Sequence, residues 1–163
     1  MEIQSKTQNN FINEFLEKYS EIIAQFDAGG TVYQIGTEES FLFSCSLIND
    51  FTPFGKSDNR IAMNATMCAQ YDLSDEEKSA MLFHEIGHIL INITEDGFEK
   101  EHAADKYAIE VGLGEALGTG LQKLIDSGFF PEAEDDMRKR IDAISHIEGT
   151  GTPCDKKKAI FEK

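Results

Sequence analysis

His84 and His88 enclose Glu85 in the sequence His-Glu-Ile-Gly-His, which is an HExxH motif. Residues four apart on a helix lie on one side of it, so both imidazoles can bind one metal ion. Glu85 projects beside them, where it can hold a water molecule and act as a general base. This pattern is typical of zinc-dependent hydrolysis, so we expect Zn²⁺ as the cofactor and both histidines as its ligands.

A catalytic zinc ion normally takes three protein ligands and leaves a fourth position to water. Residues 98–111 have helical periodicity, and Glu101 and Asp105 fall within the apolar stripe of that helix. Carboxylates in such a place need a metal ion or an ion pair. We expect Glu101 to be the third ligand and Asp105 to accept a hydrogen bond from a ligating histidine. A buried ion pair is the alternative for both carboxylates, and His102 is the alternative ligand.

Two further groups of residues are candidates for roles around the metal. An oxyanion formed during hydrolysis needs a donor or a positive charge, and the candidates are His146, Arg140, Arg138 and Tyr107. For His146, an ordinary surface position is the competing interpretation.

The alternating segment 60–68 predicts a strand, and a substrate can pair with such a strand through its backbone. The substrate-binding candidates on it are Ala62, Asn64 and Thr66.

The combination of HEIGH with the later EKEHAAD resembles the gluzincin metallopeptidases, especially the M48 family of Ste24- and HtpX-like proteases. In that family the HExxH helix is followed by a helix with ExxxD, often within ExExxAD, which is matched here by Glu99, Glu101, Ala104 and Asp105. The resemblance extends over residues 60–144. It implies His84, His88 and Glu101 as zinc ligands, Glu85 as the base and Asp105 as their support. Phe130-Pro131 stands where the family has His-Pro, and the family's Arg-Ile follows further on, at Arg140-Ile141.

Composition narrows the possible partners. The formal net charge of −15 argues against nucleic acid, because binding to phosphates requires clustered Lys and Arg. No apolar run is long enough to cross a membrane, and the polar N-terminus does not resemble a signal peptide. We therefore expect a cytoplasmic protein without membrane insertion that acts on a protein or peptide substrate.

The elements that must position the motif follow from periodicity and capping signals. Ser74 and Glu77 form a capping-box signature at the start of the HExxH helix, which should end near Leu90. Gly87 in that helix suggests a close approach of the next helix, helped by Ala103 and Ala104. The remaining pattern predicts helices over 7–26, 98–111, 116–127 and 131–147, and strands over 31–36, 40–48 and 60–68, the first two forming a hairpin.

These elements predict an α+β, zincin-like domain. It would contain an N-terminal helix, a small antiparallel sheet, the HExxH helix and C-terminal helices. Residues 1–163 would form one domain, with 148–163 as a flexible tail. The function expected is zinc-dependent hydrolysis of peptide bonds by an endopeptidase. The alternatives are a catalytically silent zinc-binding module that regulates a partner, and a structural protein without metal.

Overall fold

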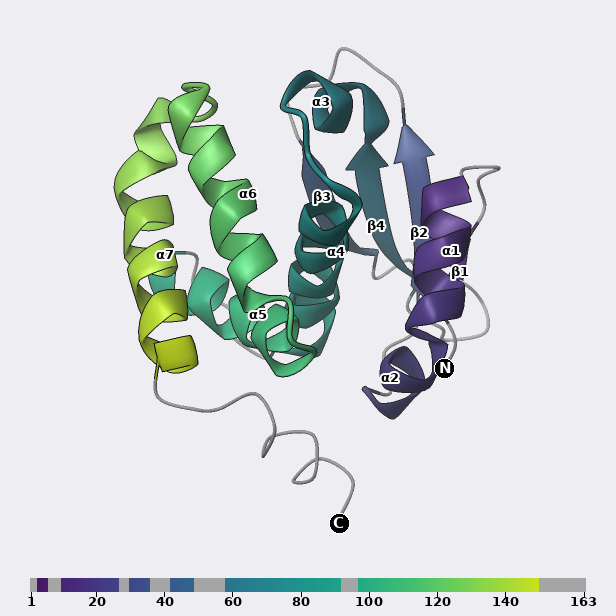
Figure 1. Cartoon of the computed structure of the whole chain (residues 1–163). Coiled ribbons are helices and arrows are strands. Elements are labelled where there is room, and N and C mark those ends of the chain that lie inside the picture. Colours follow the sequence, from purple (N-terminus) through teal and green to yellow (C-terminus); the bar gives the residue numbers. More distant parts are fainter. Residues whose placement is uncertain are drawn as a thin grey trace.

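Helices form most of the structure, a computed structural model that describes residues 3–5, 10–26, 30–35, 42–48, 58–91 and 97–149 (Figure 1). In these ranges the α-helices are α1 (Asn10–Lys18), α2 (Ser20–Gln25), α3 (Ala65–Gln70), α4 (Asp75–Leu90), α5 (Phe98–Glu110), α6 (Gly114–Asp126) and α7 (Glu134–Gly149). A 3-10 turn, η1 (Pro131–Ala133), precedes α7. The strands are β1 (Ile3–Ser5), β2 (Gly30–Ile35), β3 (Phe43–Ile48) and β4 (Asp58–Asn64).

The expected α+β fold with a small antiparallel sheet is wrong. The described part of the chain is predominantly helical, and its strands form a mixed sheet in the order β1-β2-β4-β3. The β1–β2 and β2–β4 pairs are parallel, and only β3 and β4 run antiparallel. The predicted hairpin does not form, because β4 lies between β2 and β3. Alternation along a strand indicates its buried face but not its neighbour, so the sequence pattern did not specify this order.

The strand predicted over 60–68 is correct only in its first half. Ile61 and Met63 are buried, as the alternation requires, but β4 ends at Asn64. The Asn64 side chain accepts a hydrogen bond from the Met67 backbone N–H and thereby caps α3. Asparagine is among the preferred N-cap residues, but the alternation of apolar and polar residues continues past Asn64 and conceals the start of the helix.

An aromatic cluster joins the N-terminal helices to the centre of the molecule. The predicted helix over 7–26 is two helices, α1 and α2, interrupted at Tyr19. Phe83 of α4 is fully buried and packs edge-on against Phe15 and Tyr19, with ring centroids 5.3 and 5.0 Å away. Phe26 packs against Phe83 and against Tyr107 of α5. The side of α4 that carries Phe83 is therefore held in the core.

Helix α4 is the central element. It contacts β3 and β4 of the sheet, α5 and α6, and Figure 1 shows it between the sheet and the α6–α7 pair. The predicted capping box is present: the Ser74 hydroxyl accepts from the Glu77 backbone N–H, and the Glu77 carboxylate accepts from the Ser74 N–H. The bounds predicted for this helix are confirmed, and those predicted for α5 and α6 differ by two residues or fewer.

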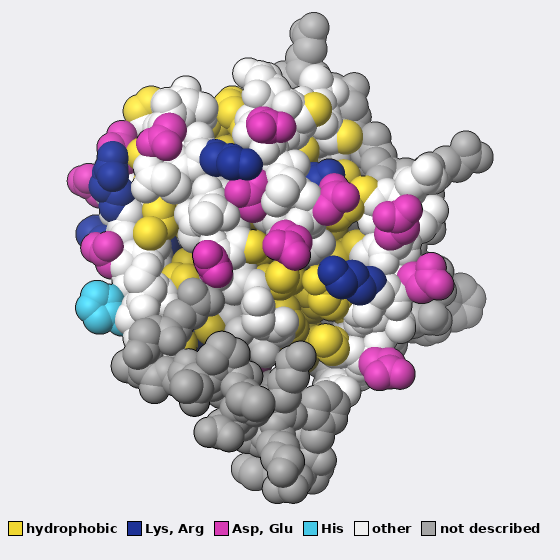
Figure 2. Space-filling model, viewed as in Figure 1, with side chains coloured by type: hydrophobic (Ala, Val, Ile, Leu, Met, Phe, Trp, Pro, Cys, Tyr) yellow, Lys and Arg dark blue, Asp and Glu magenta, His cyan; other side chains and the backbone are white. Residues whose placement is uncertain are grey.

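Acidic side chains are spread over the face shown in Figure 2, with fewer Lys and Arg among them. This distribution agrees with the net charge of −15. Among the described residues, none of the helices has the length and apolar character needed to cross a membrane. The predicted tail lies outside the described residues from 150 onward, and its first part, up to Gly149, is the end of α7.

Candidate metal centre

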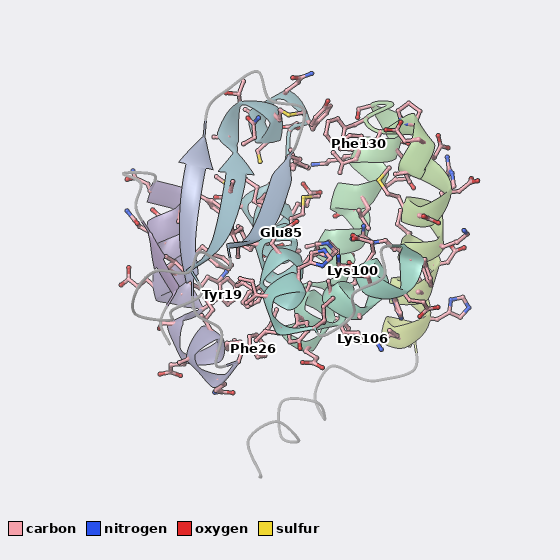
Figure 3. The ribbon with its side chains drawn as sticks, turned by 180° about the vertical axis from the view of Figure 1, so that it is seen from behind. Tyr19, Phe26, Glu85, Lys100, Lys106 and Phe130 are labelled. Atoms are coloured by element: carbon pink, nitrogen blue, oxygen red, sulfur yellow. The ribbon has the colours of Figure 1, made fainter. Side chains whose placement is uncertain are left out.

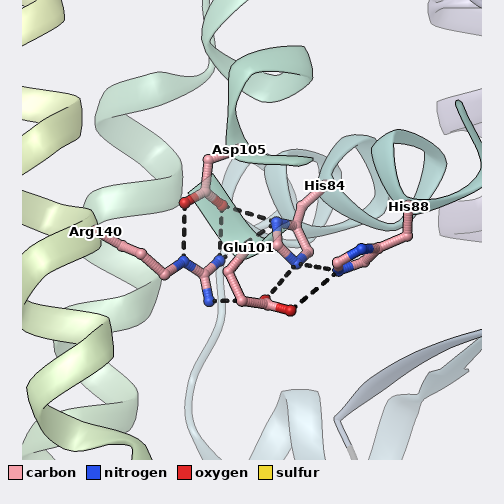
Figure 4. A network of polar contacts seen from close by, with 5 residues as sticks. All are labelled: His84, His88, Glu101, Asp105 and Arg140. Carbon is pink, nitrogen blue, oxygen red and sulfur yellow. Dashed lines mark hydrogen bonds and ion pairs between the residues drawn. The ribbon is translucent and has the colours of Figure 1, made fainter. Parts of the chain in front are cut away.

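His84 and His88 lie one turn apart on α4, and their rings turn toward the same point (Figure 4). Their Nε2 atoms are 3.0 Å apart. His84 is 6% exposed, and the His88 side chain is also largely buried. The local helical spacing thus places two imidazole nitrogens together, as the sequence predicts.

Glu101 of α5 completes the group. Its Oε2 lies 3.2 Å from Nε2 of His84, and its Oε1 lies 3.5 Å from Nε2 of His88. One potential ligand atom from each of the three residues lies within 4.8 Å of the others, so this group can hold a metal ion. The structure therefore brings Glu101, rather than His102, to the two histidines; the His102 ring instead stacks on Phe98.

The close packing of α4 and α5 depends on Gly87. A Cβ atom at this position would lie 2.8 Å from the Ala104 carbonyl oxygen and 2.8 Å from Cδ2 of Tyr107. Real Cβ atoms essentially never approach so closely, and the obstacle includes backbone. The predicted close approach of the second helix at Gly87 is confirmed, and it carries Glu101 within reach of the histidines.

Asp105 supports His84 from behind. The N–H at Nδ1 of His84 donates to Oδ1 of Asp105 at 2.7 Å, and the Asp105 side chain is fully buried. Because Nδ1 carries this proton, Nε2 of the neutral ring presents a lone pair toward His88 and Glu101. Nδ1 of His88 is buried and has no hydrogen-bond partner among the described residues.

Arg140 reaches this cluster from α7. Its Nε and Nη2 donate to the two oxygens of Asp105 at 2.8 and 2.7 Å, and its Nη1 donates to Oε2 of Glu101 at 3.2 Å. The predicted alternative of a buried ion pair is thus correct for Asp105, which pairs with Arg140 while also holding His84. Arg140 lies with Met137 and Ile144 on the buried stripe of α7. An arginine at such a position in the sequence indicates that it has a buried acidic partner.

The electrostatics of the cluster favour a cation. Burial and the Arg140 charge oppose a proton on His84, but hydrogen bonds to Asp105 and Glu101 outweigh them and raise the pKa of His84 to about 9. Burial also favours neutral Glu101, yet hydrogen bonds to His84 and His88 hold its pKa well below the ordinary value. The site therefore attracts positive charge, as a proton or as a metal ion.

Charge balance points to a divalent ion. A bound cation would displace the proton of His84 and favour ionised Glu85; in that state the three carboxylates of Glu85, Glu101 and Asp105 and the one positive charge of Arg140 leave the cluster at −2. Uncompensated charge in a buried site is costly. A divalent cation would bring the total to zero.

The distances also fit a small metal ion. Nitrogen and oxygen ligands placed tetrahedrally about 2.0–2.1 Å from zinc lie about 3.3 Å from one another. The two Nε2 atoms are 3.0 Å apart, Oε2 of Glu101 lies 3.2 Å from His84, and Oε1 lies 3.5 Å from His88, so the three residues are close enough to bind one small ion together. Two histidines and one carboxylate leave the fourth tetrahedral position for water or substrate.

Glu85 follows His84 on α4 and is 8% exposed. Figure 3 shows it on α4 on the side near the sheet. Burial raises the pKa of Glu85 above its ordinary value, although the nearby His84 and His88 act in the opposite direction. A raised pKa suits a carboxyl group that must take up and release a proton near neutral pH.

Two of the candidates for stabilising an oxyanion are exposed on α7. His146 is exposed on α7, where its Nδ1 contacts the Asp142 carbonyl oxygen. Arg138 is exposed and pairs with Glu134. Arg140 reaches the cluster with its donors directed at Asp105 and Glu101, and its role at an oxyanion stays a prediction.

Of the substrate-binding candidates, Ala62 and Asn64 lie on the predicted strand, β4, and Thr66 does not. Asn64 is fully buried and caps α3, and Thr66 is exposed on that helix rather than on a strand. Ala62 is on β4, whose two edges are occupied by β2 and β3. A substrate cannot add to β4, because no free edge of it remains.

Comparisons with known proteins do not assign the chain to a family. No protein-family model matches it, and no significant match is found among curated proteins or among solved structures.

Proposed function

We propose that this chain is a zinc-dependent metallopeptidase that hydrolyses peptide bonds. The observation that carries the proposal is the convergence of His84, His88 and Glu101, with Glu85 next to His84 on the same helix. The resemblance of HEIGH and EKEHAAD to the gluzincin motifs supports the same activity.

Zinc is the metal that this set of donors favours. Imidazole nitrogen together with one carboxylate suits zinc better than calcium or magnesium, which prefer oxygen ligands. Two histidines and one glutamate are one of the ligand sets found in catalytic zinc sites. The short distances between the donor groups and the net charge of the cluster agree with this choice.

His84, His88 and Glu101 would hold the zinc ion, which would supply a Lewis acid for the scissile carbonyl and lower the pKa of water toward neutrality. Glu85 accepts the proton of the attacking water and later gives it to the leaving amine. Asp105 holds the proton at Nδ1 of His84, so that the Nε2 lone pair stays directed into the site.

The edge of the sheet beside α4 offers a way to hold an extended substrate. β3 is the last strand of the described sheet, pairs with β4 on one side and packs against α4. An extended peptide can pair with such an edge through backbone hydrogen bonds, largely independently of its sequence. β3 therefore replaces β4 in the proposal as the strand that receives the substrate.

Cleavage of an unfolded protein by the wild type and by Glu85→Gln tests the proposal. The wild type with one equivalent of zinc should cleave the substrate, and Glu85→Gln should lose about 10²–10⁴-fold of that rate while retaining zinc. Zinc content measured on the same samples separates loss of the base from loss of the metal.

Equal cleavage by the two proteins would point to a contaminating protease and refute the role of Glu85. Zinc bound stoichiometrically without cleavage by either would instead support a silent zinc-binding module.

A further inference from the structure

We infer that Arg140 is a positioning residue of the metal centre, which fixes the orientations of Asp105 and Glu101 before a metal ion binds. The inference rests on the metal site of the proposed function, but it concerns α7, which supplies no ligand. Figure 4 shows Arg140 approaching from α7, on the opposite side of the cluster from His88.

The guanidinium group of Arg140 contacts two carboxylates at once. Nε and Nη2 donate to both oxygens of Asp105, and Nη1 donates to Oε2 of Glu101. A guanidinium group is planar and rigid, so its three nitrogens fix three acceptor oxygens relative to one another. Asp105 and Glu101 lie one turn apart on α5, and one side chain therefore aligns both.

This alignment extends to the ligand atoms. Oδ1 of Asp105 accepts both from Arg140 and from Nδ1 of His84, so the arginine sets the carboxylate that orients the imidazole. Oε2 of Glu101 accepts from Arg140 and lies 3.2 Å from Nε2 of His84, which leaves Oε1 facing His88. Two of the three ligands are thus directed by a residue that does not bind the metal.

Burial makes the arginine hard to replace. The Asp105 side chain has no exposed surface, and the Arg140 side chain is 10% exposed. A buried carboxylate without a paired charge is strongly destabilising. Lysine would keep the charge but offers a single nitrogen, which cannot span three acceptor oxygens in a plane.

Arg140→Lys tests the inference through metal binding rather than through activity. Zinc affinity is measured by competition with a chromophoric chelator, and the ligand geometry by the visible absorption of the cobalt(II) form. We expect Arg140→Lys to bind zinc about 10–100-fold more weakly, the usual cost of losing an outer partner of a metal ligand, and to change the cobalt spectrum.

Two controls on the same helix separate positioning from stability. Arg138→Lys alters an exposed arginine whose salt bridge in the described part of the chain is with Glu134, and it should leave zinc affinity and the cobalt spectrum unchanged. Ile144→Ala removes a buried side chain of α7 that is not part of the cluster. It should lower the unfolding temperature while the folded protein keeps the wild-type affinity and spectrum.

A second variant keeps the test open if lysine disturbs folding. Arg140→Ala should bind zinc weakly, and millimolar ethylguanidinium, which can occupy the vacated space, should restore part of the affinity. The same compound should not alter zinc binding by the wild type.

Wild-type affinity and spectrum in folded Arg140→Lys would overturn the inference, and so would an equal loss in Ile144→Ala. If the wild type binds zinc but cleaves no peptide, the peptidase proposal fails and the inference on Arg140 stands. If the wild type binds no zinc, both fail.

Discussion

At the scale of single residues, burial decides which side chains can react. His84, Glu85 and Asp105 are buried together, and their protonation is set by one another and by Arg140. Cys68 is buried as well, but it lies in the hydrophobic core. Burial thus shifts the pKa values of the polar cluster around His84, and it makes the thiol of Cys68 inert.

We predict that Cys68 resists alkylation in the native protein. Burial, opposed only in part by the Lys78 charge, raises the pKa of Cys68 from 9.0 to about 11, so at pH 8 it has roughly a hundredfold less thiolate than an ordinary cysteine. The rate of reaction with iodoacetamide is measured in a variant with Cys45 and Cys154 changed to serine. The native protein should react at least about a hundredfold more slowly than the protein unfolded in urea. Equal rates would contradict the burial of Cys68.

At the scale of elements, α4 connects the core to the metal cluster. One side carries Phe83 into the aromatic core, Gly87 admits α5, and the start of the helix is joined to α6 by a salt bridge between Glu77 and Lys123 at 2.8 Å. The contacts of Gly87 and Glu77 can each be tested by a substitution, with the same substitution at another position as its control.

Gly87→Ala should destabilise the protein and weaken metal binding. Alanine gains about 1 kcal/mol in helix propensity over glycine, but its Cβ would collide with the α5 backbone at a cost of about 1–3 kcal/mol and displace Glu101. Gly118→Ala, on α6, is the matched control, because no atom of the described residues would lie within 4 Å of a Cβ added there. It should stabilise the protein by up to about 1 kcal/mol in urea unfolding. Equal effects of the two substitutions would refute the close packing at Gly87.

Glu77→Gln should reduce stability at pH 7 but not at low pH. Burial favours the neutral carboxyl, yet hydrogen bonds from Lys123 and Ser74 hold the pKa of Glu77 below its ordinary value of 4.5. The stabilisation is therefore present above the unfolded-state pKa and is lost as the pH falls through the folded-state pKa. We expect a loss of about 1–2 kcal/mol at pH 7, measured by urea unfolding, that shrinks toward zero near pH 3.

Glu76→Gln is the control for this prediction, because Glu76 lies in the same first turn of α4 but is exposed. Its interaction with the helix dipole is worth only a few tenths of a kcal/mol to about 1 kcal/mol. A loss at pH 7 as large as that of Glu77→Gln would show that the dipole, and not Lys123, accounts for the effect.

At the scale of the whole molecule, the hydrophobic core extends well beyond the candidate metal site. The buried apolar residues extend from α1 through the sheet and α4 to α6 and α7, and the cluster lies between α4, α5 and α7. Arg140 supplies part of the positive charge that the cluster needs when no metal is bound. The fold should therefore persist without metal, unlike that of a zinc finger.

Metal removal should lower the unfolding temperature without unfolding the protein. Zinc at about 100 times its dissociation constant should add about 2.7 kcal/mol, which corresponds to a rise of about 5–10 °C for a chain of this size. Far-UV circular dichroism should be the same with zinc and with a chelator. His88→Ala should show no zinc-dependent rise, and loss of helical signal in the chelated wild type would contradict an independent core.

The sequence by itself determined the features that depend on neighbours within one or two turns. The capping box at Ser74, the shared direction of His84 and His88, and the small side chain at Gly87 follow from helical geometry, which repeats every 3.6 residues. Glu101 was correctly expected beside the two histidines, because a carboxylate on an apolar stripe needs partners of this kind.

Only the tertiary structure decided which distant elements meet. β4 lies between β2 and β3 in the sheet. Arg140 of α7 pairs with Asp105, which is 35 residues earlier in the chain. Periodicity indicates which face of an element is buried, but it carries no information about the partner on the other side. That choice depends on how all the buried faces pack at once, and it left β4 paired on both edges and Arg140 directed at Asp105 and Glu101.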